Sequence, residues 1–207
     1  MKKMMSKIAM GLGLSIALIA CTKDEETIVV PVSAITVKDL AADTVTGLGL
    51  DGRPQSAGTT TYYSLVDNKI IASSDAASTK WDIAFKGTTI LTNSGNGGPG
   101  MGGAFVYVGL FSDLKTIPAD STFKTENAPT SYAITTGSNK GWYVYDGLNN
   151  LITPIPGRVL VVKTASGKYA KIEILNYYKG GVTPAASASD LIKMKEQRYY
   201  TFRYSFQ

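Results

Sequence analysis

Trp81-Asp82-Ile83-Ala84-Phe85 is the stretch that best indicates the fold of this 207-residue chain. It predicts a buried strand, and residues 88–91 predict its hairpin partner. The next stretch, Asn93-Ser94-Gly95-Asn96-Gly97-Gly98-Pro99-Gly100-Met101-Gly102-Gly103, is too rich in glycine for regular structure, and ordering it costs backbone entropy. Met101 is its one large apolar side chain, so its thioether is the only soft donor that this loop offers to a flat ligand.

Strand patterns dominate the rest of the chain. Residues 59–66 are rich in Thr and Tyr, which favours a half-buried strand. Residues 160–164 and 169–175 flank the turn Ala165-Ser166-Gly167-Lys168 and predict a hairpin. The second of these strands alternates apolar residues with Lys171 and Glu173, which predicts one buried face and one solvated face.

The C-terminal residues have the same two-residue period. One face carries Tyr200, Phe202, Tyr204 and Phe206, which predicts an amphipathic strand that closes the core. Helix signals are confined to residues 113–117 and 190–196, both short. We therefore predict an all-β fold, mainly antiparallel, built as a sandwich or a bent sheet with few short helices.

The N-terminus has the layout of a lipoprotein signal peptide. Lys2, Lys3 and Lys7 precede an apolar run that is too short to span a bilayer comfortably, and Leu18-Ile19-Ala20-Cys21 matches a bacterial lipobox. We expect a signal peptide over residues 1–20, a lipidated Cys21 with a linker over 21–34, and a single domain over 35–207. Residues 22–26, Thr-Lys-Asp-Glu-Glu, resemble a lipoprotein surface-export signal, although a solvated charged tether explains them equally well.

Composition excludes several classes of function. Three of the 21 basic residues lie in the signal, which leaves 18 against 16 acidic ones and no dense basic stripe, so nucleic acid is not an expected partner. The chain has no histidine, and its one cysteine is the lipidation site. Histidine-based triads, histidine-bound zinc and histidine-bound haem are therefore excluded, and we expect no enzyme and no catalytic residues. Asp82 is expected to bond nearby backbone rather than to perform chemistry.

Several stretches together resemble the HmuY family of haem-binding lipoproteins. They are the strand at residues 81–85, Thr92-Asn93-Ser94-Gly95 with Gly103-Ala104, Pro154-Ile155-Pro156-Gly157-Arg158 with residues 161–169, Tyr177-Tyr178, and Arg198-Tyr199-Tyr200-Thr201-Phe202-Arg203-Tyr204. The resemblance covers most of residues 35–207 in the same order. It implies a protein held at the outer membrane and cell surface by its lipid, which captures haem and passes it to a TonB-dependent outer-membrane receptor for iron acquisition.

The resemblance also implies two facing loops that each supply an axial ligand to the haem iron. The first loop corresponds to residues 93–103, where Met101 is the candidate ligand and the only metal contact expected. The second corresponds to residues 146–151, which hold no His or Met and place Asn149 or Asn150 at the ligand position. We expect Trp142, Tyr143 and Tyr145 to pack against the ring of haem or a related porphyrin. Met194 is a further thioether in a different segment.

A second hypothesis keeps the fold without haem. The glycine loop and the aromatic residues would then recognise another small molecule, a glycan or a protein partner, and the Asn149-Asn150 pair favours this alternative. A structure that shows whether the 93–103 and 146–151 loops face each other would separate the two.

Overall fold

The computed structural model describes residues 33–207, and Val32–Gln207 forms a compact unit by itself. The predicted signal peptide, the lipidation site Cys21 and most of the predicted linker lie outside the described residues, so these expectations remain predictions. Within the described part, no helix is both long and apolar enough to cross a membrane.

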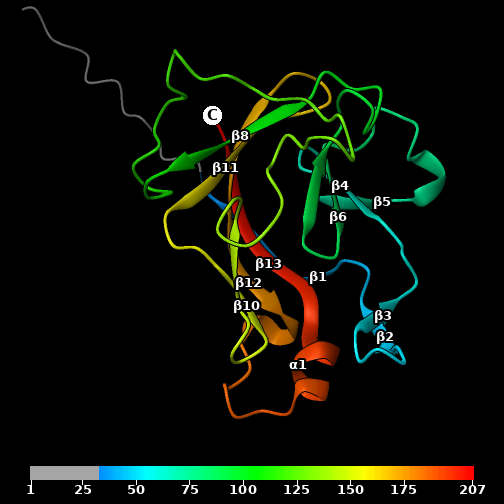
Figure 1. The fold of residues 1–207 in the computed structure, drawn as a ribbon. Helices are drawn as coiled ribbons and strands as arrows, with labels where there is room; N and C mark the ends of the chain where they lie inside the picture. The colour runs from blue at the N-terminus through cyan, green and yellow to red at the C-terminus, as the bar shows by residue number, and fades with distance from the viewer. Residues whose placement is uncertain (1–32) are drawn as a thin grey trace, which may run out of the picture. The chain divides into compact units, whose positions relative to one another are not determined.

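The larger of two main sheets has five antiparallel strands and contains the longest strands of the protein (Figure 1). Its order is β1 (Ile35–Ala41), β13 (Gln197–Phe206), β12 (Tyr169–Tyr178), β11 (Arg158–Lys163) and β8 (Gly103–Val108). The predicted hairpin is confirmed, because β11 and β12 pair antiparallel across the turn that contains Gly167. Gly167 has φ +88°, a backbone conformation that glycine adopts without strain. The predicted C-terminal strand is confirmed as β13.

The smaller main sheet has four antiparallel strands and includes Ile83, Ala84 and Phe85 of the stretch at residues 81–85. Its order is β5 (Lys69–Ile71), β4 (Thr61–Ser64), β6 (Ile83–Lys86) and β7 (Thr89–Thr92). The predicted hairpin of residues 81–91 is confirmed by the β6–β7 pairing, although β6 begins at Ile83. Residues 59–66 contain β4, as predicted.

Two hairpins and short helices complete the described chain. The hairpins are β2 (Val45–Leu48) with β3 (Pro54–Ser56), and β9 (Tyr143–Asp146) with β10 (Leu151–Pro154). The helices are the 3₁₀ helices η1 (Ser73–Asp75) and η2 (Lys179–Gly181) and the α-helix α1 (Asp190–Glu196). The short helix predicted at residues 190–196 is confirmed, and the Ser189 hydroxyl caps it by accepting from the Ile192 N–H. The helix predicted at residues 113–117 is wrong, because that segment is irregular, with a turn that ends at Asp113 and a bend at Thr116.

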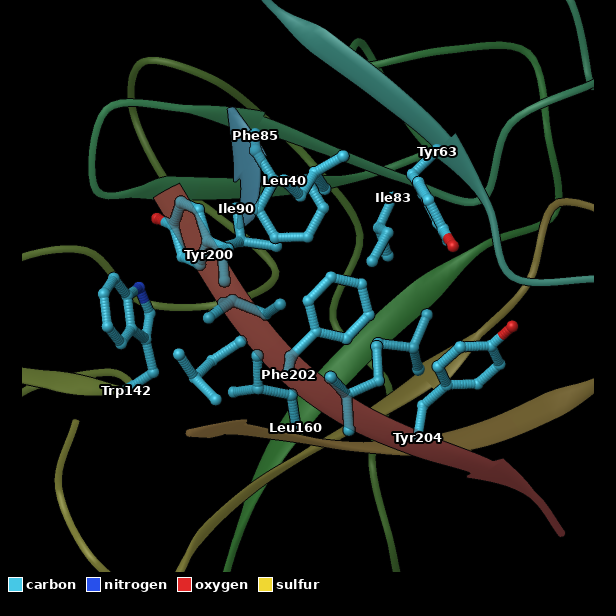
Figure 2. Close-up of a cluster of buried hydrophobic side chains, with 14 of the residues drawn as sticks. Leu40, Tyr63, Ile83, Phe85, Ile90, Trp142, Leu160, Tyr200, Phe202 and Tyr204 are labelled. Atoms are coloured by element: carbon cyan, nitrogen blue, oxygen red, sulfur yellow. The ribbon is translucent and has the colours of Figure 1, made fainter. Parts of the chain in front are cut away.

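The two main sheets pack face to face, which confirms the sandwich. Figure 2 shows aromatic and aliphatic side chains from both sheets meeting in one core. The rings of Phe85 in β6 and Phe202 in β13 stack with centroids 5.6 Å apart. Tyr200 and Tyr204, on either side of Phe202 along the inner face of β13, are fully buried, and their hydroxyls donate to the carbonyl oxygens of Gly87 and Leu65. Each hydroxyl therefore ties β13 to the smaller sheet.

The outer face of the five-stranded sheet is covered rather than solvated. Phe111, Leu114, Val159 and Val161 form a second apolar cluster there. The prediction that Lys171 lies on a solvated face is wrong, since the residue is 7% exposed. Its ammonium donates to the carbonyl oxygens of Phe111 and Leu114, each at 2.7 Å, so Lys171 fastens the covering segment to the sheet. Burial, followed by repulsion from Lys115 and Arg203, lowers its pKa.

Candidate functional site

The glycine loop at residues 93–103 is fastened from within by Asn93. This fully buried side chain donates to the carbonyl oxygens of Ser78 and Trp81 at 2.9 and 2.8 Å, and its own oxygen accepts from the Gly100 N–H at 2.8 Å. The backbone of Asn93 also accepts from the Gly102 N–H. These bonds tie Asn93 to the segment that precedes β6 and hold Gly100 and Gly102 against Asn93.

Glycine is needed in this loop because other chain segments come close to it. A Cβ on Gly95 would overlap the Glu126 carbonyl oxygen, and one on Gly100 would lie 2.7 Å from the Cβ of Ala165. Gly98 is equally crowded, because a Cβ built there would lie 2.8 Å from the Trp81 ring. The glycines therefore permit close packing, and this packing offsets the entropy cost of ordering the loop.

Met101 lies at the edge of this packed loop with its side chain 63% exposed. Its N–H donates to the Ala165 carbonyl oxygen at 3.0 Å, which places it beside the β11–β12 turn. The thioether methyl reaches toward Gly167 of the same turn. Met101 is accessible, but it lines none of the three pockets described below.

The residues predicted to accompany Met101 divide into two groups. Trp142 and Tyr143 belong to the main core, with 2% and 9% exposure, and the indole N–H of Trp142 donates to the Thr88 carbonyl oxygen. Tyr145, Asn149 and Asn150 lie at the exposed tip of the β9–β10 hairpin. There Asn149 donates to the Asp146 carboxylate at 2.7 Å, and Asn150 accepts from the Tyr145 hydroxyl at 2.7 Å. Both amides thus shape the turn.

The hairpin tip and Met101 lie at opposite ends of β12. The tip is joined to the Tyr178 end, where the Tyr178 hydroxyl accepts from the Ile152 N–H. Met101 bonds the turn that precedes Tyr169, at the other end. Ten strand residues span roughly 30 Å at about 3.3 Å per residue. The 93–103 and 146–151 loops therefore do not face each other across one slot.

A pocket of about 260 Å³, which we call the tip pocket, opens between the hairpin tip, the β2–β3 hairpin and α1. Tyr145, Asn150 and Ile152 line it from the β9–β10 hairpin, and Met194 lines it from α1. Arg53 adds a cation that is exposed and 3.6 Å from Asp51. Leu191, which follows the lining residue Asp190 in sequence, is an exposed apolar residue of α1.

A buried lysine fixes the geometry of the tip pocket. The Lys193 ammonium donates to the carbonyl oxygens of Asn149 and Ala186, each at 2.7 Å, and lies 3.7 Å from the Asp190 carboxylate. Lys193 is only 4% exposed. Helix α1 is thereby tied to the hairpin tip, so Met194 and Tyr145 are held in fixed relation.

A second pocket, the hydroxyl groove, has a volume of about 540 Å³ and lies in the segment between β8 and β9. All but one of its lining residues carry a hydroxyl or an amine: Lys124, Thr125, Pro129, Thr130, Ser131, Tyr132, Thr135, Thr136 and Lys140. Sequence reasoning missed this groove, because such residues are scattered over 17 positions in a stretch without strand or helix signals.

The buried carboxylates of the described chain are structural. Asp82 accepts from the N–H groups of Leu65 and Ala165 at 2.8 and 3.0 Å, which confirms that it bonds backbone. Glu126 accepts from the N–H groups of Thr92 and Ala133, and burial raises the pKa of both carboxyls. Within residues 33–207, no group of three or more His, Cys, Asp or Glu residues is arranged to hold a metal ion.

The fold is a two-sheet, all-β sandwich, and comparison with known proteins gives its family. The model of the HmuY protein family matches residues 56–204, well over half of the chain. The chain therefore belongs to the HmuY family, which is a family of binding proteins. No curated protein matches it.

Solved structures of similar fold include proteins from Bacteroides and Tannerella species. A putative lipoprotein from Bacteroides fragilis is 17% identical with a TM-score of 0.50, over 83% of this chain and 90% of that one. A putative HmuY-like haem-binding protein from Bacteroides vulgatus is 16% identical with a TM-score of 0.48, over 84% and 90%. The apo HmuY analogue of Tannerella forsythia is 19% identical with a TM-score of 0.44, over 85% and 95%.

Proposed function

We propose that this protein is a lipoprotein of the cell surface that captures haem or a related porphyrin for transfer to an outer-membrane receptor. Membership of the HmuY family is the observation that carries the proposal. The protein would supply binding and orientation, whereas redox chemistry at iron belongs to the haem itself.

The tip pocket is the part of the described chain that best fits such a ligand. Met194 offers a thioether, the Tyr145 ring and Ile152 offer apolar surface, and Arg53 offers a partner for a carboxylate. At about 260 Å³ the pocket is smaller than the 300–1,000 Å³ typical of enclosing ligand sites. It would therefore enclose only part of a tetrapyrrole, and the rest of the ring would lie outside it.

The thioether of Met194 predicts which oxidation state of the haem iron binds more tightly. A thioether is a soft, neutral ligand, so binding through Met194 should favour the ferrous form. Met101, exposed at the other end of β12, remains the ligand predicted from the sequence, and its position makes it a matched control for Met194.

The test is a haemin titration of residues 22–207, followed by the Soret band under oxidising and reducing conditions. We expect a Soret shift, with tighter binding after reduction. Met194→Leu should weaken ferrous binding about tenfold, or 1.4 kcal/mol, whereas Met101→Leu should leave it unchanged. Loss of the shift only in Met101→Leu would move the ligand to the glycine loop. A titration without any Soret change would contradict haem capture altogether.

A polar small molecule such as a glycan is the second candidate ligand, and the hydroxyl groove favours it. Five Thr or Ser hydroxyls, the Tyr132 phenol and two lysines surround a volume that is large enough for a sugar. Saturable binding on a glycan panel that is lost in Tyr132→Ala and kept in Met194→Leu would support this function. Binding to no member of the panel would count against it.

A further inference from the structure

A third pocket lies on the outer face of the five-stranded sheet, away from the tip pocket. It has a volume of about 500 Å³ and lies between the segment that covers the second apolar cluster and the start of β12. Its lining comprises Lys115, Thr116, Ile117, Pro118, Ala119, Ser121, Phe123, Tyr169 and Gln207. We call it the outer-face pocket.

One wall of the outer-face pocket is aromatic and held in place. The Phe123 ring lies 5.3 Å from the Tyr169 ring, and on its other side it makes an edge-on contact with Phe105 at 5.1 Å. Ile117 packs against the second apolar cluster, and Tyr169 is 37% exposed. These side chains present a fixed flat surface of the kind that stacks with another ring.

The pocket lining also contains one cation. Lys115 lines it, and among the described residues no carboxylate lies within 4.0 Å of its ammonium. Lys171 and Arg203 contact the Phe111 ring, 4.4 and 4.6 Å from its centre, and neither they nor Phe111 belong to the pocket lining. Only Arg203 has an ion-pair partner among these three cations, the Glu173 carboxylate at 2.6 Å. Lys115 therefore offers an acidic group one cationic partner beside an apolar wall.

We propose that the outer-face pocket binds an amphipathic organic anion, with a flat aromatic body against Phe123 and Tyr169 and its acidic group at Lys115. The volume suits a small organic molecule, and the lining has the usual composition of such sites, which is mostly apolar with a few polar groups that fix orientation. The site is separate from the tip pocket and independent of haem capture.

The test uses 8-anilinonaphthalene-1-sulfonate as the anion and residues 22–207 as the protein, with fluorescence as the readout. We expect saturable binding at one site. Lys115→Gln should raise the Kd about tenfold, because a hydrogen bond to a charged group is lost. Lys115 is exposed, so this variant should fold normally.

Two controls and a neutral probe make the test decisive. Lys140→Gln removes a cation from the hydroxyl groove, and Met194→Leu changes the tip pocket, so both should keep the wild-type Kd. N-phenyl-1-naphthylamine lacks the sulfonate, and its binding should not respond to Lys115→Gln. An unchanged Kd for the sulfonate in Lys115→Gln, or an equal loss in Lys140→Gln, would overturn the proposal.

Discussion

At the scale of single residues, Asn93 does most to shape the glycine loop. Its amide makes three hydrogen bonds in a fully buried position, two from its nitrogen and one to its oxygen. A buried polar group that loses its partner costs about 1–3 kcal/mol. The order of the loop therefore depends on one side chain as much as on its glycines.

Asn93→Ala should lower the free energy of unfolding by about 3 kcal/mol, because it strands two carbonyl oxygens and one N–H. Urea denaturation measures the change. Asn96→Ala is the matched control: Asn96 also bonds backbone from this loop, but in an exposed setting, so about 1 kcal/mol or less is expected. Equal losses in the two variants would contradict this account of the loop.

Glu126 should make stability depend on pH. Burial raises its pKa above the ordinary value of 4.5, so the folded state holds the proton more tightly than the unfolded chain does. Its contribution to stability is fully present below about pH 4.5 and is lost as the pH rises through the raised pKa. Wild type should therefore lose stability relative to Glu126→Gln as the pH is raised above about 4.5 in urea denaturation. A difference that stays constant as the pH rises would be inconsistent with the raised pKa.

At the scale of elements, α1 and the β9–β10 hairpin act as one body because Lys193 joins them. Lys193→Met keeps the length of the side chain but removes the ammonium. It should cost about 2 kcal/mol of unfolding free energy and speed amide hydrogen exchange at Leu148 and Asn149. Lys195→Met, on an exposed position of the same helix, should change neither. Unchanged exchange at the tip in Lys193→Met would show that the lysine does not hold it.

Elements with a clear period were predictable from the sequence, and those without one were not. The alternation in residues 169–175 and 200–206 gave strands that the structure confirms. The prediction that Lys171 lies on a solvated face of β12 was wrong. Two-residue alternation identifies the polar side of a strand but cannot reveal that an irregular segment will cover that side. Trp142 was expected to pack against a ligand, but it lies in the core. The sequence beside a tryptophan does not indicate whether protein side chains or a ligand will bury it.

The placement of the candidate site depended on contacts between distant segments. Met101 and the hairpin tip were expected to face each other, yet they lie at opposite ends of β12. Tyr145 and Asn150 do share a pocket, but they share it with Met194, which is 44 residues beyond Asn150 in the chain. Sequence reasoning named all three residues and had no means of pairing them.

At the scale of the whole molecule, the binding domain is expected to remain at the membrane through the lipid on Cys21. Cys21→Ser removes the only thiol of the chain and with it the acylation site. The protein should then leave the membrane fraction and carry no palmitate label, because acyl chains supply the membrane affinity. A variant that stayed in the membrane fraction would show that another segment holds it there.

The central claim is that the tip pocket, rather than the glycine loop, contacts haem. Residues 22–207 contain only two methionines, Met101 and Met194, so methyl-labelled methionine gives one NMR signal for each. Haemin should shift or broaden the Met194 signal and leave the Met101 signal in place. A change at Met101 alone, or at neither methionine, would contradict the claim.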